Sequence, residues 1–127
     1  MTPKALSREI KFRAWNDSKK DWEGNFSISR IGSFLRLGIS QSTEGIHVMQ
    51  YTGLLDKNGK EIYENDYLQW GDGVEIMWVF WDSGKYILQN ISSGDIIDCN
   101  ENTTSVREII GNRYESPREH KAMASDL

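Results

Sequence analysis

Apolar and polar residues alternate along several short stretches of this chain, and turn-forming residues separate these stretches. Between residues 10 and 15, the even positions are apolar, whereas Lys11, Arg13 and Trp15 share the other side. A period of two residues predicts a half-buried strand. The chain then turns and returns in a second strand from Trp22. Similar patterns predict strands at residues 46–51, 67–70, 85–89 and 96–97, and a last strand within 106–114. Residues 75–81 are apolar on both faces and predict a central strand covered on both, and residues 100–105 predict a loop.

The central stretch, residues 51–70, has the strongest turn signal. Two apolar pairs flank the polar residues 56–60, which contain the step Asn58-Gly59. Both residue types tolerate positive φ, so we expect a β-hairpin here. A second tight turn at Glu64-Asn65-Asp66 precedes the strand at 67–70.

The same stretch carries a family resemblance. Its motif is Tyr51-Thr-Gly-Leu, Asp56, Asn58-Gly-Lys, Ile62-Tyr-Glu and Asp66, and residues 9–15, 79–86 and 109–117 supply flanking matches in order. Together they resemble the YopX-like phage protein family. The resemblance implies a phage or prophage origin but no established activity. Asn65 stands where that family usually has Gly, and Asn also tolerates the left-handed region.

Two segments do not follow the strand pattern. Residues 26–39 fit either a strand or a helix, because Phe26 and Ile28 alternate while the later apolar residues have helical spacing. Residues 116–127 have no apolar pattern, so we expect a flexible tail. We therefore predict one YopX-like domain at residues 1–115 and a tail at 116–127.

Many short strands joined by turns are typical of a small barrel or sandwich. We predict a mainly β fold, with α+β possible: an SH3-like barrel or sandwich of short antiparallel strands with at most one or two short helices. The SH3-like part is an analogy of strand order and does not fix a function.

Composition limits the cellular compartment in which we expect the protein. The chain has 127 residues and a single cysteine, Cys99, which excludes an internal disulfide. It has no apolar run of the roughly 20 residues that a spanning helix needs, and its first residues lack the apolar core of a signal peptide. We expect a protein of the bacterial host cytoplasm that does not contact membranes.

Candidate chemistry is sparse. His47 and His120 are the only histidines, and no spacing of ligands suggests a metal site. Cys99 lies between Asp98 and Asn100, and negative surroundings do not activate a thiol. Glu64 and Asp66 could be an acid and a base, but an Asp after a turn more often accepts backbone N–H bonds. We predict no enzyme activity, no catalytic residue, no metal and no cofactor.

Charge and aromatic residues give two functional hypotheses. Residues 1–20 carry six basic and two acidic groups, whereas residues 54–101 carry three basic and ten acidic groups. In the first hypothesis, surplus aromatic residues form an interface, so the protein self-associates and binds a host or phage protein. In the alternative, the basic N-terminal strand contacts phosphates of nucleic acid. The interface candidates are Trp70, Trp78, Trp81 and Tyr86; the nucleic-acid candidates are Lys4, Arg8, Lys11 and Arg13; the structural turn residues are Asn58, Gly59, Asn65 and Asp66.

Overall fold

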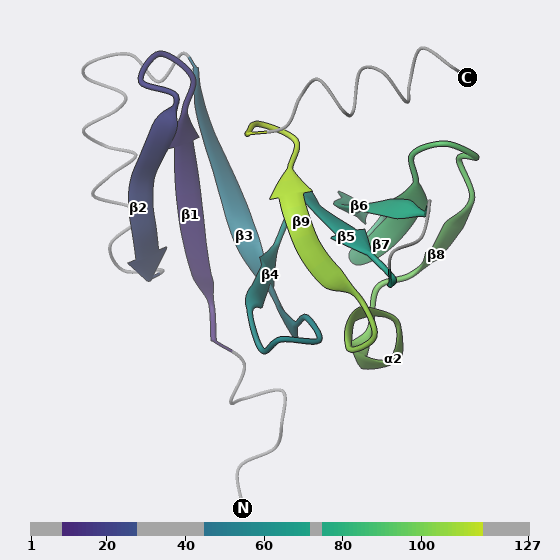
Figure 1. The fold of residues 1–127 in the computed structure, drawn as a ribbon. Helices are drawn as coiled ribbons and strands as arrows, with labels where there is room; N and C mark the ends of the chain where they lie inside the picture. Colours follow the sequence, from purple (N-terminus) through teal and green to yellow (C-terminus); the bar gives the residue numbers. More distant parts are fainter. Residues whose placement is uncertain (1–8, 28–44, 72–74, 116–127) are drawn as a thin grey trace, which may run out of the picture.

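The structure, a computed structural model, describes residues 9–27, 45–71 and 75–115. Within these residues it contains two antiparallel sheets and one short helix (Figure 1). The ambiguous segment lies outside the described residues from position 28 onward, as does the predicted tail at 116–127. None of the described helices is long and apolar enough to cross a membrane.

One sheet has four strands in the order β2-β1-β3-β4. The other has five strands in the order β8-β7-β6-β5-β9, and each pair of neighbouring strands is antiparallel. The prediction of a small, mainly β fold of short antiparallel strands is therefore confirmed. The strands of the first sheet are β1 (Lys11–Asn16), β2 (Asp21–Ser27), β3 (Ile46–Leu55) and β4 (Glu61–Tyr63). Those of the second are β5 (Asp66–Gln69), β6 (Ile76–Asp82), β7 (Lys85–Asn90), β8 (Ile96–Asp98) and β9 (Glu108–Asn112).

The apolar residues form two buried clusters. The first joins β4 to the five-stranded sheet through Ile62, Leu68, Met77, Val79 and Leu88. The second lies on the four-stranded sheet and contains Trp15, Met49, Tyr51 and Tyr63. The hairpin of β3 and β4 contributes to both, because Ile62 and Leu54 pack in the first cluster while Tyr63 and Met49 belong to the second.

The alternation in β1 is observed, and the side with the two cations is largely covered. Lys11 and Arg13 retain 19% and 13% exposure of their side chains, and Trp15 is buried. On the apolar side, Ile10 just before the strand is 43% exposed and Phe12 is half-buried, whereas Ala14 is fully buried. A period of two residues shows which residues share a face, but not which face is covered.

The predicted turns are present. Gly59 has φ +80° in the turn between β3 and β4, and Asp56 accepts hydrogen bonds there from the N–H groups of Asn58 and Lys60. Asn65 has φ +71° between β4 and β5, which confirms that Asn occupies the left-handed region at this turn.

Strand β6 differs from its prediction as a strand covered on both faces. Met77 and Val79 are buried, whereas Trp78 and Phe80 on the opposite face are only half-buried and stack with ring centroids 4.5 Å apart. The sheet therefore covers its second face with its own aromatic rings. Trp81 at the end of the strand is 51% exposed.

A one-turn helix, α2 (Glu101–Thr104), lies in the stretch expected to be a loop. The side chain of Asn100 accepts a hydrogen bond from the Thr103 N–H group, and the Thr103 hydroxyl accepts one from the Asn100 N–H group. This reciprocal cap satisfies two donors at the start of the helix.

Candidate functional site

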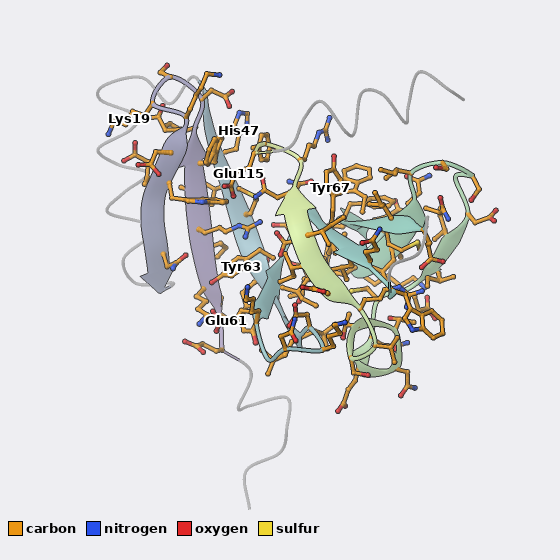
Figure 2. All side chains as sticks on the ribbon, in the orientation of Figure 1. Lys19, His47, Glu61, Tyr63, Tyr67 and Glu115 are labelled. Atoms are coloured by element: carbon orange, nitrogen blue, oxygen red, sulfur yellow. The ribbon has the colours of Figure 1, made fainter. Side chains whose placement is uncertain are left out.

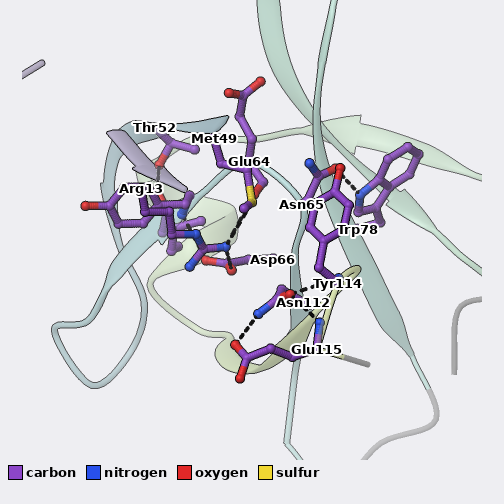
Figure 3. A network of polar contacts seen from close by, with 12 residues as sticks. Arg13, Met49, Thr52, Glu64, Asn65, Asp66, Trp78, Asn112, Tyr114 and Glu115 are labelled. Carbon is purple, nitrogen blue, oxygen red and sulfur yellow. Dashed lines mark hydrogen bonds and ion pairs between the residues drawn. The ribbon is translucent and has the colours of Figure 1, made fainter. Parts of the chain in front are cut away.

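A buried ion pair connects the two sheets. Nη2 of Arg13, on β1, lies 2.5 Å from Oδ1 of Asp66, the first residue of β5 (Figure 3). The Asp66 side chain is 1% exposed. Its second oxygen, Oδ2, accepts a hydrogen bond of 2.9 Å from the Tyr63 N–H group. This bond agrees with the prediction that an Asp at this turn accepts backbone N–H groups.

Two aromatic rings hold the guanidinium of Arg13. Its Cζ atom lies 4.6 Å from the ring centroid of Trp22, on β2, and 4.7 Å from that of Tyr63, on β4. Nη2 also lies 3.4 Å from the Glu64 carbonyl oxygen and 3.6 Å from the Met49 sulfur. These contacts fix the plane and the position of the charge.

Burial dominates the titration of Asp66. It raises the pKa of this carboxyl from 3.8 to about 6, although Arg13 and the Tyr63 N–H group favour the charged form. The negative charge of Glu115 acts in the same direction as burial. The pKa of the Asp66 carboxyl therefore lies above that of an ordinary aspartate even though Asp66 has a cationic partner.

The turn that positions Asp66 is fixed on both sides. Glu64 Oε1 accepts a hydrogen bond of 2.6 Å from the Gln50 N–H group of β3. Asn65 Oδ1 accepts one of 3.0 Å from Nε1 of Trp78 on β6, and the Asn65 carbonyl accepts one from the Arg113 N–H group. Strands from both sheets thus determine where the Asp66 carboxylate lies.

A cavity of about 510 Å³ opens beside this ion pair. We call it the inter-sheet groove, because its walls come from strands of both sheets. Glu61, Tyr63 and Glu115, which line it, are labelled in Figure 2. The four-stranded sheet contributes Arg13, Trp22, Gly24, Asn25, Glu61 and Tyr63, with Lys60 just before β4; the other wall contains Asp66, Ile109, Gly111, Asn112 and Glu115.

The end of β9 forms one rim of the groove. Asn112 Nδ2 donates a hydrogen bond of 2.6 Å to Glu115 Oε1, and Asn112 Oδ1 accepts bonds from the N–H groups of Tyr114 and Glu115. Asn112 is also the register partner of Asp66 in the sheet. This turn holds the Glu115 carboxylate at the groove.

The four residues proposed for nucleic-acid contact do not form one described surface. Lys4 and Arg8 lie outside the described residues. Lys11 forms ion pairs with Glu61 and Glu9, and Arg13 forms its ion pair with Asp66. The charges of Lys11 and Arg13 are thus balanced inside the fold, and nucleic-acid binding stays a prediction.

The four interface candidates divide into exposed and covered rings. Trp70 is 59% exposed, with the Arg107 guanidinium 5.3 Å from its ring centroid, and Trp81 is 51% exposed. Tyr86 is buried against Trp81, and Trp78 is half-buried. Only Trp70 and Trp81 are therefore available as large surface rings, and they remain interface candidates.

His47 and Cys99, the histidine and cysteine considered as catalytic or metal-binding residues, have structural surroundings. His47 Nε2 lies 2.8 Å from Asp17 Oδ2, and its ring stacks on Tyr114 with centroids 4.2 Å apart. Burial raises the pKa of the Cys99 thiol to about 12. The thiol was expected not to be activated because of its acidic neighbour, whereas the cause of its raised pKa is burial. Among the described residues, no three His, Cys, Asp or Glu side chains cluster closely enough to hold a metal ion.

Two features around the site were not predicted from the sequence. Trp22 and Tyr63 were assigned to strands, but nothing in their spacing placed both rings on Arg13. Asp56 was placed in a turn, but its Oδ2 atom also accepts a hydrogen bond of 3.0 Å from the Ile109 N–H group of β9. This buried carboxylate therefore ties the central hairpin to the other sheet.

Comparisons with known proteins give a family and one structural likeness. The family model described as YopX protein matches residues 11–119. A crystal structure titled protein EF1440 from Enterococcus faecalis is similar, with a TM-score of 0.61 and 19% sequence identity; the match covers 87% of this chain and 97% of that chain. At this identity the likeness concerns the fold alone. No curated protein matches the sequence.

Proposed function

This chain belongs to the YopX protein family, and we propose that it is a non-enzymatic phage or prophage accessory protein that binds a segment of another protein in the inter-sheet groove. The observation that supports this most is the composition of the groove. It brings together aromatic walls, a fixed guanidinium and carboxylates from strands far apart in the sequence. Binding sites characteristically combine apolar walls with a few convergent polar groups.

The position of the groove favours an extended protein segment as its occupant. It is lined by Gly24 of β2 and Gly111 of β9, and each strand lies at the edge of its sheet as described. Edge strands recruit extended peptides through their backbone groups. Glycine in a strand leaves room for a second backbone to approach closely.

A blocking variant tests whether partner binding uses the groove. Asn25 is exposed and lines the groove, so Asn25→Trp places a large ring in it. Ser93→Trp, in the exposed turn before β8, is the matched control. Wild type and both variants would be used to capture proteins from a nuclease-treated bacterial host lysate, followed by mass spectrometry.

We expect one stoichiometric protein with the wild type and with Ser93→Trp, and its loss with Asn25→Trp. A partner that binds equally to Asn25→Trp would place binding elsewhere on the surface. If all three baits capture no protein, the protein-binding proposal is wrong.

Self-association is the second part of the proposal and involves different residues. Trp70 and Trp81 are exposed to 59% and 51%, and aromatic residues are enriched in the cores of interfaces. Gel filtration with light scattering at micromolar concentration should give a mass above that of the 14.6 kDa chain. Substituting both residues with Ser should lower that mass, and a wild-type monomer would contradict this part.

A further inference from the structure

Arg13 uses only part of its hydrogen-bonding capacity. Among the described residues, every hydrogen bond that its side chain makes comes from Nη2, and the buried Nε atom has no acceptor. Leaving a buried donor without an acceptor is costly, and such groups call for an explanation. Nη1 also bonds to no acceptor among the described residues, and the guanidinium lines the groove, so an occupant can supply an acceptor to the donors that remain. Contact with Nε itself requires the atoms that now cover it to move.

The guanidinium is already fixed before any occupant arrives. The rings of Trp22 and Tyr63 lie within 5 Å of its Cζ atom, at 4.6 Å and 4.7 Å, and Asp66 holds Nη2. A pre-organised group loses little conformational entropy when it binds. The planar guanidinium also holds its remaining donors in fixed directions, whereas the donors of a flexible ammonium group can rotate.

The charges around the groove are nearly balanced. Its lining contains two cations, Arg13 and Lys60, and three carboxylates, Glu61, Asp66 and Glu115. Glu61 is neutralised by Lys11, which lies outside the lining. A strongly charged segment of either sign would therefore meet repulsion or disrupt an existing pair, whereas a neutral acceptor adds no charge to the site.

A neutral polar occupant also needs an acceptor for its own N–H groups. Glu115 supplies one, because its Oε1 atom accepts one bond from Asn112 and a carboxylate has further lone pairs on both oxygens. An extended peptide backbone presents carbonyl acceptors and N–H donors along its length. In the groove, the Arg13 guanidinium can bind such a carbonyl, and the Glu115 carboxylate can bind such an N–H group.

We propose that Arg13 is the specificity-determining residue of the groove: its remaining guanidinium donors bind a main-chain carbonyl of an extended, uncharged segment of the partner protein. This inference rests on the proposed function, since it names what that groove recognises. It assigns Arg13 to peptide recognition and not to the phosphates of nucleic acid.

The test uses a displayed library of random linear peptides selected against the full chain. Selected peptides would be measured against wild type, Arg13→Lys and the matched control Arg113→Lys, which changes an exposed arginine outside the lining of the groove. Lysine keeps the positive charge beside Asp66 but lacks the planar guanidinium, whose donors point in fixed directions. We expect about tenfold weaker binding with Arg13→Lys and no change with Arg113→Lys.

A thioamide scan of the best peptide then identifies the acceptor, because sulfur is a weaker acceptor than oxygen. One thioamide position should weaken binding to wild type and have little effect on Arg13→Lys. If binding depends instead on an Asp or Glu side chain of the peptide, the carbonyl assignment is wrong. Equal binding to wild type and Arg13→Lys would overturn the role of Arg13 and leave groove binding intact.

A measurement on the unmodified protein covers the case in which Arg13→Lys does not fold. The ¹⁵Nε–¹Hε resonance of Arg13 should shift when the selected peptide is added. An unchanged resonance in the saturated complex would overturn the proposal. A library that yields no peptide, with single-stranded DNA binding to the groove instead, would overturn both this inference and the proposed function.

Discussion

Arg13 and Asp66 are 53 positions apart in the sequence, yet Nη2 of one lies 2.5 Å from Oδ1 of the other. The contact joins β1 of the four-stranded sheet to β5 of the five-stranded sheet. Breaking a buried pair by removing one member leaves the other charge uncompensated. This contact is therefore more important for stability than a surface ion pair such as Lys85–Asp98, whose side chains are 64% and 68% exposed.

Asp66→Ala should lower the free energy of unfolding by about 3 kcal/mol or more at neutral pH. The variant loses the partner of Arg13 and the acceptor of the Tyr63 N–H group. Urea unfolding followed by tryptophan fluorescence measures the change. Asp95→Asn, at an exposed position, is the control and should change the free energy by less than about 0.5 kcal/mol.

Adding Arg13→Met to Asp66→Ala should restore part of the lost stability, because the double variant no longer buries an unpaired guanidinium. Strictly additive losses in this double-mutant cycle would mean that the two side chains do not stabilise each other.

The free energy of unfolding should depend on pH through the ionisation of Asp66. Its pKa is about 6 in the folded protein against 3.8 for the unperturbed group. The folded state therefore binds the proton more tightly, and this contribution is fully present below about pH 4 and lost as the pH rises through about 6. Asp66→Asn removes the ionisable group at this position and is the reference for its contribution.

The unfolding free energy of wild type relative to Asp66→Asn should thus fall by up to about 3 kcal/mol between about pH 4 and pH 7. Urea unfolding of both proteins across this range gives the difference directly. A difference that grows with pH would show that the attraction of Arg13 outweighs burial.

Asn65 should tolerate Gly better than Ala. Its φ of +71° strains an L-residue, and Ala also loses the acceptor for Trp78 Nε1. We expect Asn65→Ala to cost about 2 kcal/mol and Asn65→Gly about half of that, because Gly removes the strain although it loses the same bond. Thermal and urea unfolding compare the two; equal losses would mean that the bond to Trp78 matters and the backbone strain does not.

Cys99 should be nearly inert in the native protein. Burial raises the pKa of its thiol to about 12, so the thiolate fraction near pH 8 is about a thousandfold below that of a free cysteine. Reaction with a thiol-specific disulfide reagent should be slow in buffer and fast in concentrated urea. A fast native reaction would contradict the raised pKa of this partly exposed thiol.

The strands and turns could be predicted because their signals are local. Alternation identified β1, and the step Asn58-Gly59 with its flanking apolar pairs identified the central hairpin. The cap of α2 also has a local signal, because Asn100 is followed three positions later by Thr103. The prediction of a loop at residues 100–105 did not take this signal into account.

The site could not be predicted, because its residues meet only through tertiary contacts. In β1, the alternation placed Lys11 and Arg13 on one face, but it gave no sign that Glu61 and Asp66 supply their carboxylates from other strands. No periodicity along one segment reveals such a partner.

The hairpin of β3 and β4 has a consequence for the dynamics of the chain. Its residues belong to both apolar clusters, Ile62 to one and the adjacent Tyr63 to the other. An opening fluctuation that exposes either cluster must disturb strands on which the other depends, so the two sheets share their protection against amide hydrogen exchange. The segment that carries the family motif thereby links the two halves, and we expect any ligand that slows the opening of one sheet to slow the opening of the other.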